Sequence, residues 1–330
     1  MTTLYRAADL RLGRGAPAEA AAVKQVQRDL RSLGYLQAGI DGTFGRKTEA
    51  AIRALQYDLL HNDGRGRDGA APVAVREFNR GRVTAVSGVL DAGLGAVIAD
   101  LLADARYPRI PCSPNPAEEN AKVAAAIEAL AAPGVPVPFL VAVLKQESGL
   151  KHFCEPTASD EDNFVVVGLD RNSTEKDAVT SRGYGAGQFT LFHHPPTPDE
   201  VRTVILDPAG NARQAVQELR DKFRRFVNGE TPGTAAEERV EEQGRGPLRV
   251  CKYEAGDPRH LADCRNCLAA AGTADVLLAP TQYHRREEYR GVPVRRNIGC
   301  DWPYAVRRYN GGGINSYHYQ AQVLLRVLNG

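Results

Sequence analysis

The chain has 330 residues, of which 43% are hydrophobic and 25% are charged, a composition typical of globular proteins. Its 42 basic and 40 acidic residues give a formal net charge of +2, which argues against nucleic-acid binding driven by bulk charge. No apolar run approaches the roughly 18 residues that a membrane-spanning helix needs, so we expect no membrane span. The N-terminal residues also lack the apolar run of a secretory signal peptide, so we expect synthesis in the cytoplasm without one.

Helical patterns fill the first third of the chain. Residues 1–17 are rich in Gly, Ala and Arg, and we expect a flexible arm there. Apolar residues between Val23 and Leu33 recur at the spacing of one helix face, and Gly34 is a suitable C-cap. The pattern predicts a second helix around residues 48–56 and a third around residues 94–102.

One stretch of this region carries turn, aromatic and helix positions in a fixed order. They are Val23, Gln27, Leu30, Leu33-Gly34-Tyr35, Asp41-Gly42, Phe44-Gly45, Thr48, Ala51 and Leu55-Gln56. This order resembles the small three-helix peptidoglycan-binding domain of bacterial cell-wall enzymes, and the stretch from Gly88 to Leu94 resembles the end of the same module. The resemblance implies a peptidoglycan-binding domain at residues 18–105, with an insertion at residues 61–86 and peptidoglycan as the partner.

A cluster of prolines follows the helical module. Pro108, Pro111, Pro114 and Pro116 lie within nine residues, and a Pro-rich run is typical of a semi-rigid spacer. We therefore predict a linker at residues 106–116 and a second domain at residues 117–330. In that domain the patterns predict helices at 117–131, 137–150, 199–228 and 314–328, a strand at 164–167, and an exposed loop at 229–249.

The predicted helix at residues 137–150 carries one acidic residue on its apolar face. Glu147 shares that face with Leu140, Val143 and Leu144. Apolar surroundings raise the pKa of a carboxyl group, and a raised pKa suits a general acid that protonates a glycosidic oxygen near neutral pH. Gly149 would end the helix and leave space for a sugar. A structural glutamate bonded to a neighbouring turn would give the same pattern.

Further motifs follow this glutamate along the chain. In order, the set is Glu147-Ser148-Gly149, Gly185-Ala186-Gly187-Gln188-Phe189-Thr190, Leu206-Asp207-Pro208-x-x-Asn211 and Arg308-Tyr309-Asn310-Gly311-Gly312. The set resembles the lysozyme-like lytic transglycosylase domain over residues 117–330. The resemblance implies a mainly α protein, in which a small helical wall-binding bundle precedes a lysozyme-like α+β domain with a short β-hairpin lobe.

The same resemblance implies roles for individual residues. Glu147 would be the catalytic acid and base, and Ser148, Gln188, Tyr309 and Asn310 would bind substrate. The family usually has a hydrophobic-Met-Gln turn at this place, whereas this chain has Ala-Gly-Gln. The implied activity is cleavage of the β-1,4 bond between MurNAc and GlcNAc, in which the muramyl C6 hydroxyl attacks and leaves a 1,6-anhydro end.

Two alternatives stay open at this point. A hydrolase resembling goose-type lysozymes would need a second carboxylate to hold a water, about 6.5–9.5 Å from the acid. Asp160 and Asp170 lie in the polar segment where such a base could sit. The other alternative is an inactive, wall-binding structural protein, against which the presence of Glu147 argues.

The six cysteines permit several interpretations. An even count is compatible with disulfides in an oxidising compartment. The spacing Cys264-x-x-Cys267, together with Cys251 and His260, is compatible with half of a zinc site, and free thiols are the third possibility. We expect at least one disulfide and no metal or cofactor.

The way in which the protein reaches the cell wall also has alternatives. We expect action in the periplasm or at the cell wall, after release through a phage holin or export by a contact-dependent secretion machine. The protein would then be an endolysin or an antibacterial effector, and an effector would have an immunity or inhibitor protein as a further partner.

Overall fold

The computed structural model describes residues 5, 10–11, 19–37, 39–110, 113, 115–130, 134–157, 162–227, 249–272, 298–311 and 315–330. Most of the predicted arm at 1–17 and of the predicted loop at 229–249 lies outside the described residues, as do Cys112 and Asp160. Helices dominate the structure, which confirms the mainly α class. None of the helices in the described part of the chain is both long and apolar enough to span a bilayer.

The chain divides into two compact units, each built from two separate segments. The first unit contains Met1–Ala121 and Lys151–Asn211, and the second contains Lys122–Leu150 and Ala212–Gly330. Our predicted linker at residues 106–116 therefore falls within the first unit, where Tyr107 and Ile110 are buried. Whether the two predicted domains fold separately stays a prediction.

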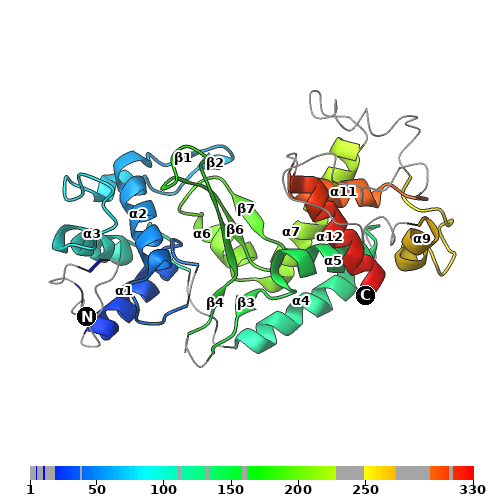
Figure 1. The fold of residues 1–330 in the computed structure, drawn as a ribbon, viewed down its shortest axis with the longest axis horizontal. Coiled ribbons are helices and arrows are strands. Elements are labelled where there is room, and N and C mark those ends of the chain that lie inside the picture. The colour runs from blue at the N-terminus through cyan, green and yellow to red at the C-terminus, as the bar shows by residue number, and fades with distance from the viewer. Residues whose placement is uncertain are drawn as a thin grey trace. The chain divides into compact units, whose positions relative to one another are not determined.

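Three helices form the N-terminal part of the first unit, as predicted (Figure 1). They are α1 (Ala20–Ser32), α2 (Arg46–His61) and α3 (Ala92–Ala103), and the short 3-10 helix η2 (Val75–Phe78) lies between α2 and α3 in the sequence. Their apolar faces share one core, in which Leu30, Leu55 and Ile98 are fully buried. Gly34 ends the first helix with a φ of 82°, which only glycine adopts without strain.

Short antiparallel strands make up the rest of the first unit. Strand β3 (Phe153–Cys154) pairs with β4 (Phe164–Val165), and β5 (Val167–Arg171), β6 (Val179–Tyr184) and β7 (Phe189–Leu191) form a three-stranded sheet in that order. A two-residue pair, β1 (Arg65–Gly66) with β2 (Gly69–Ala70), lies within the predicted insertion. The strand that we predicted at 164–167 is thus divided between two sheets. Helix α6 (Pro198–Glu200) and the π-helical turn η3 (Val201–Ile205) follow.

A buried polar network joins the helices of the first unit to the three-stranded sheet. Arg182 on β6 lies 3.5 Å from the carboxylate of Asp58 on α2, and the hydroxyl of Tyr35 donates to the same carboxylate at 2.7 Å. Arg182 also donates to the carbonyl oxygen of Gly34 at 3.1 Å. A buried charge is tolerated when it is paired and hydrogen-bonded, so this network fixes the helices on the sheet.

The second unit is helical. It contains most of α4 (Pro116–Leu130) and of α7 (Pro208–Asp221), with α5 (Val137–Ser148), the π-helical η4 (Lys222–Val227), α9 (Cys264–Ala270), α11 (Trp302–Tyr309) and α12 (Asn315–Asn329). Helix α12 packs against α5 and α11. The stretch predicted as helical at 199–228 is helical up to residue 227, apart from a break at Leu206 and Asp207, because Pro208 cannot continue a preceding helix. The lysozyme-like assignment of this part stays a prediction.

Candidate functional site

Helix α5 places Glu147 in its last turn. The helix ends at Gly149, whose φ of 68° allows its own N–H and that of Leu150 to cap the carbonyl groups of Lys145 and Leu144. This is the helix end that the sequence predicted. Leu144 is fully buried one turn earlier, whereas Glu147 is partly buried. The glutamate therefore lies where the buried face of α5 reaches the end of the helix.

A tyrosine from α12 holds the Glu147 carboxylate. The hydroxyl of Tyr319 donates to Oε1 of Glu147 at 2.5 Å. Burial raises the pKa of Tyr319 well above its usual value of 10, and the charge of Glu147 and their hydrogen bond raise it further. Tyr319 therefore stays protonated as a donor, and its hydrogen bond orients the carboxylate.

The other sequence-predicted residues of the second unit have distinct positions. Tyr309 is the last residue of α11; burial raises its pKa well above 10, with smaller contributions from the charges of Glu147 and Glu218. Asn310 is the exposed C-cap of the same helix. The hydroxyl of Ser148 donates to the carbonyl oxygen of Leu144 at 3.1 Å, within its own helix. The structure thus brings Tyr309 into the electrostatic neighbourhood of Glu147 and turns Ser148 toward α5.

Gln188 belongs to the first unit, in the turn between β6 and β7. Its φ is 51°, and its side-chain amide donates to the carbonyl oxygen of Gly185 at 2.9 Å. Its Oε1 lies over Gly168 and Gly183, where an added Cβ would come within 2.5 and 2.8 Å of that oxygen. These contacts make Gln188 a residue that shapes the turn; its predicted contact with substrate stays a prediction.

Two further residues hold this turn, and the sequence analysis singled out neither as a site residue. The N–H of Ala186 donates to Nδ1 of the buried His152 at 3.3 Å, and Nε2 of His152 lies 2.8 Å from the carbonyl oxygen of Ile205. These partners fix the neutral tautomer with its proton on Nε2, and burial lowers the pKa of His152 to about 4. Asn211 accepts from the N–H of Gly187 at 2.7 Å. Asn211 did occur in the Asp-Pro-x-x-Asn motif, whereas no local pattern marks His152.

The candidate second carboxylates are differently placed. Asp170 lies within β5, is exposed, and accepts a hydrogen bond of 2.9 Å from the hydroxyl of Ser181. It belongs to the first unit, whereas Glu147 belongs to the second. In the second unit Glu218 acts electrostatically on Tyr309, as Glu147 does. The sequence analysis missed Glu218, which pairs with Lys222 at 2.7 Å one turn further along the chain.

The N-terminal helices hold two loops in place through buried glutamines. The side-chain amide of Gln27 donates to Asp41, to Thr48 and to the carbonyl oxygen of Thr43 at 2.8–3.1 Å, and its Oε1 accepts from the N–H of Gly42 at 3.0 Å. Gln56 accepts from the N–H groups of residues 87 and 88 in the same way. The motif positions quoted from the sequence are therefore the positions that fix these loops.

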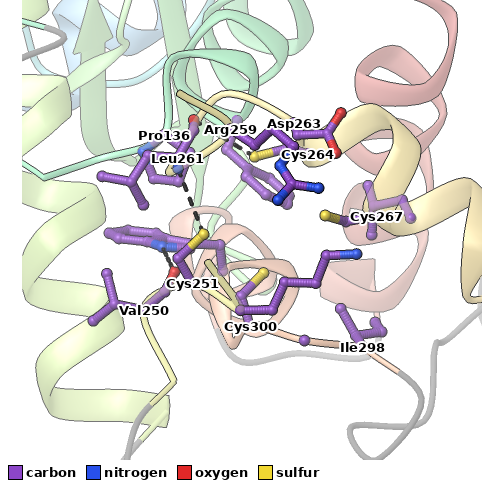
Figure 2. A pocket seen from close by; sticks show the side chains of 15 residues that line it. Pro136, Val250, Cys251, Arg259, Leu261, Asp263, Cys264, Cys267, Ile298 and Cys300 are labelled. Carbon is purple, nitrogen blue, oxygen red and sulfur yellow. Dashed lines mark hydrogen bonds between the residues drawn. The ribbon is translucent and has the colours of Figure 1, made fainter. Parts of the chain in front are cut away.

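Four cysteines of the second unit line one small pocket. They are Cys251, Cys264, Cys267 and Cys300 (Figure 2). No disulfide joins any two of the described cysteines, so our expectation of a bridge is not confirmed. The four sulfurs face one space as a group rather than meeting in two pairs. Burial raises the pKa of Cys300 to about 12. No three His, Cys, Asp or Glu side chains in the described part of the chain are already placed around a metal position.

Comparison with known proteins identifies the N-terminal part. Residues 19–59 match the family model of the peptidoglycan binding domain. No curated protein and no solved structure matches the chain. The match covers α1, the loop held by Gln27 and most of α2. Residues 19–59 of this chain are therefore a peptidoglycan-binding domain by their sequence, which supports peptidoglycan as a partner and suggests an association with the cell wall.

Proposed function

We propose that the protein cleaves the glycan strand of peptidoglycan between MurNAc and GlcNAc, as a lytic transglycosylase whose acid and base is Glu147. The observation that carries the proposal is the carboxylate of Glu147 at the end of α5, oriented by the buried Tyr319 at 2.5 Å. The peptidoglycan-binding domain supports the proposal, because it would hold the chain on the polymer that the site would cleave.

The proposed reaction needs one carboxyl group used twice. Protonated Glu147 gives its proton to the glycosidic oxygen as the bond from that oxygen to C1 breaks. The resulting carboxylate then takes the proton of the muramyl C6 hydroxyl as its oxygen bonds to C1. The ring closes to the 1,6-anhydro product, water is not consumed, and Glu147 regains its proton. Tyr319 and Tyr309 stay protonated throughout, since their pKa values lie well above 10.

A hydrolase is the second candidate, and one observation favours it. Glu218 and Glu147 both act electrostatically on Tyr309, so two carboxylates of the second unit lie near one tyrosine. A water-using enzyme needs such a pair. Glu218 is about half exposed and pairs with Lys222, and in this alternative it would be the base that holds the water.

Digestion of purified sacculi by the full chain tests the proposal. We expect the wild-type protein to release muropeptides with anhydro ends, which mass spectrometry distinguishes because they are lighter than reducing ends by one water. Glu147→Gln should abolish release, because an amide cannot donate and take back the proton. Glu128→Gln, an exposed glutamate on α4, is the matched control and should retain activity.

The outcomes separate the candidates. Release by Glu147→Gln at the wild-type rate would contradict the assignment of the acid. New ends that all carry the added water would identify a hydrolase, and Glu218→Gln and Asp170→Asn would then test for its base. If the wild-type chain sediments with sacculi but releases no muropeptides, the result would identify a wall-binding structural protein.

We also propose that the chain acts in the periplasm or at the wall after holin-mediated release or contact-dependent secretion. Peptidoglycan as the partner supports that place of action. Expression in the cytoplasm should then be harmless, whereas the same chain directed to the periplasm should lyse cells unless an inhibitor protein is present. Equal toxicity in both compartments would contradict this proposal.

A further inference from the structure

The pocket lined by four cysteines is not used by the proposed reaction. Its sulfurs come from three separate segments: Cys251, then Cys264 and Cys267 on α9, then Cys300 immediately before α11 (Figure 2). Much of the remaining lining is apolar and includes Leu268 and Trp302. Side chains far apart in the sequence therefore bring four like chemical groups to one small space.

The spacing of the cysteines matches a known class of ligand set. Cys264 and Cys267 lie three residues apart on one helix, so both project from the same side of α9. Two cysteines separated by two residues are a common half of a structural zinc site, and such sites are closed by four thiolates in a tetrahedron. Cys251 and Cys300 supply the other two. His260 is excluded, because it does not line the pocket.

The polar groups around the sulfurs favour metal-bound thiolates over disulfides. The N–H of Leu261 donates to the sulfur of Cys251 at 3.5 Å, and the cation of Lys252 lines the same pocket. A Zn²⁺ ion with four thiolates carries a net charge of −2, which donors and cations stabilise. A disulfide sulfur is uncharged and gains little from them.

Two charged residues complete the lining. Arg259 adds a second cation beside the pocket and also pairs with Asp257 at 2.8 Å. Asp263 is the carboxylate of the lining; it accepts hydrogen bonds from Tyr253 at 2.8 Å and from Asn266 at 2.6 Å. The carboxylate is thereby hydrogen-bonded by its own neighbours.

We propose that Cys251, Cys264, Cys267 and Cys300 bind a structural Zn²⁺ ion that fastens residues 249–272 and 298–302 together. In this structure the four sulfur atoms are not arranged around one point at metal–ligand distance. Their backbone positions already surround the pocket, and rotation about the Cα–Cβ bond of each cysteine moves its sulfur without moving that backbone. This part of the chain has one short helix with Cys264 and Leu268 as its buried residues. A short segment of this kind gains folding free energy when its side chains bind a metal.

Metal analysis of the full chain, purified without chelators from zinc-supplemented cells, tests this proposal. We expect one zinc ion per chain by mass spectrometry of the elements, released by a mercurial reagent that blocks thiolates. Co²⁺ in its place should give intense visible bands of a tetrahedral thiolate site. Cys267→Ser should lose the zinc, whereas Cys154→Ser, in the first unit, should retain it.

Two results would overturn the site. One is wild-type protein that stays metal-free in zinc-supplemented cells and gives no thiolate bands with Co²⁺. The other is peptide mapping without reductant that finds any two of the four cysteines bridged in the purified protein. The cobalt spectrum is recorded on the unaltered chain, so it decides the question even if the Cys267 variant fails to fold. Neither result depends on whether sacculi are cleaved.

Discussion

The hydroxyl of Tyr319 donates a hydrogen bond of 2.5 Å to Oε1 of Glu147, across 172 residues of sequence. The contact joins α12 to the last turn of α5, so the final helix of the chain orients the carboxylate that the motif analysis singled out. Any loss of this helix would leave the carboxylate without that donor.

Removing the phenol oxygen of Tyr319 should lower cleavage more than it lowers stability. Hydrogen bonds to charged groups contribute about 1.5–3 kcal/mol, so we expect Tyr319→Phe to lose about 10- to 100-fold in kcat/KM on sacculi. Tyr317→Phe on the same helix is the control, because its buried ring stacks with Arg307. Equal kinetics for both variants would show that Tyr319 does not orient the acid.

His152 should make the first unit sensitive to acid. Its pKa is about 4 in the folded state because of burial, against 6.5 for an ordinary histidine. Between these values the unfolded chain binds a proton that the folded chain does not, so the free energy of unfolding falls as the pH falls, by at most about 3 kcal/mol. His194, whose pKa burial also lowers, acts in the same direction.

Denaturant titrations between pH 4 and 7 check this prediction. His152→Asn should reduce the dependence of stability on pH without abolishing it, since His194 remains. The exposed His61 provides the control variant His61→Asn, which should keep the wild-type dependence. An unchanged slope in the His152 variant would disprove the role of this residue.

The buried pair of Asp58 and Arg182 should matter far more than a surface pair between the same parts of the first unit. The side chains of Asp58 and Arg182 are 11% and 3% exposed, whereas those of Asp177 and Arg53 are 24% and 35% exposed. Asp58→Asn leaves a buried guanidinium without its counter-charge, which should cost about 3–5 kcal/mol of unfolding free energy. Asp177→Asn should cost at most about 1 kcal/mol. Urea unfolding of the two variants measures the difference.

Gln27 should be needed for wall binding. Its side chain holds the loop at residues 41–43 through several hydrogen bonds, so Gln27→Ala should release that loop. The change is made together with Glu147→Gln, so that cleavage does not interfere with the binding measurement. We expect less of this double variant to sediment with sacculi, while its helical circular dichroism signal is retained. Binding as strong as that of Glu147→Gln alone would place the contact with peptidoglycan elsewhere.

Local patterns in the sequence predicted the helices and their ends well. The apolar spacing of α1 and the glycine after α5 are short-range signals, and the structure contains both features. The same reasoning placed Glu147 at the end of the buried face of α5. These successes share one cause: the information lies within about one helical turn of the residue concerned.

The residues that the analysis missed depend on partners far away in the chain. His152 bonds to residues 34 and 53 positions later, and Tyr319 lies 172 positions after Glu147. No periodicity records such distances. The burial of Tyr107 within the predicted linker has a similar origin, because its hydroxyl donates to the carbonyl oxygen of Leu33, 74 positions earlier.

The first unit is complete only when its second segment, Lys151–Asn211, has been synthesised. During synthesis Asp58 leaves the ribosome 124 residues before Arg182, the cation that it meets in the finished fold. A nascent chain therefore carries the helices of its wall-binding domain for some time without the sheet that they pack on. Domains usually fold in the order in which they emerge, but the first unit here includes a segment that is synthesised after α5 with Glu147.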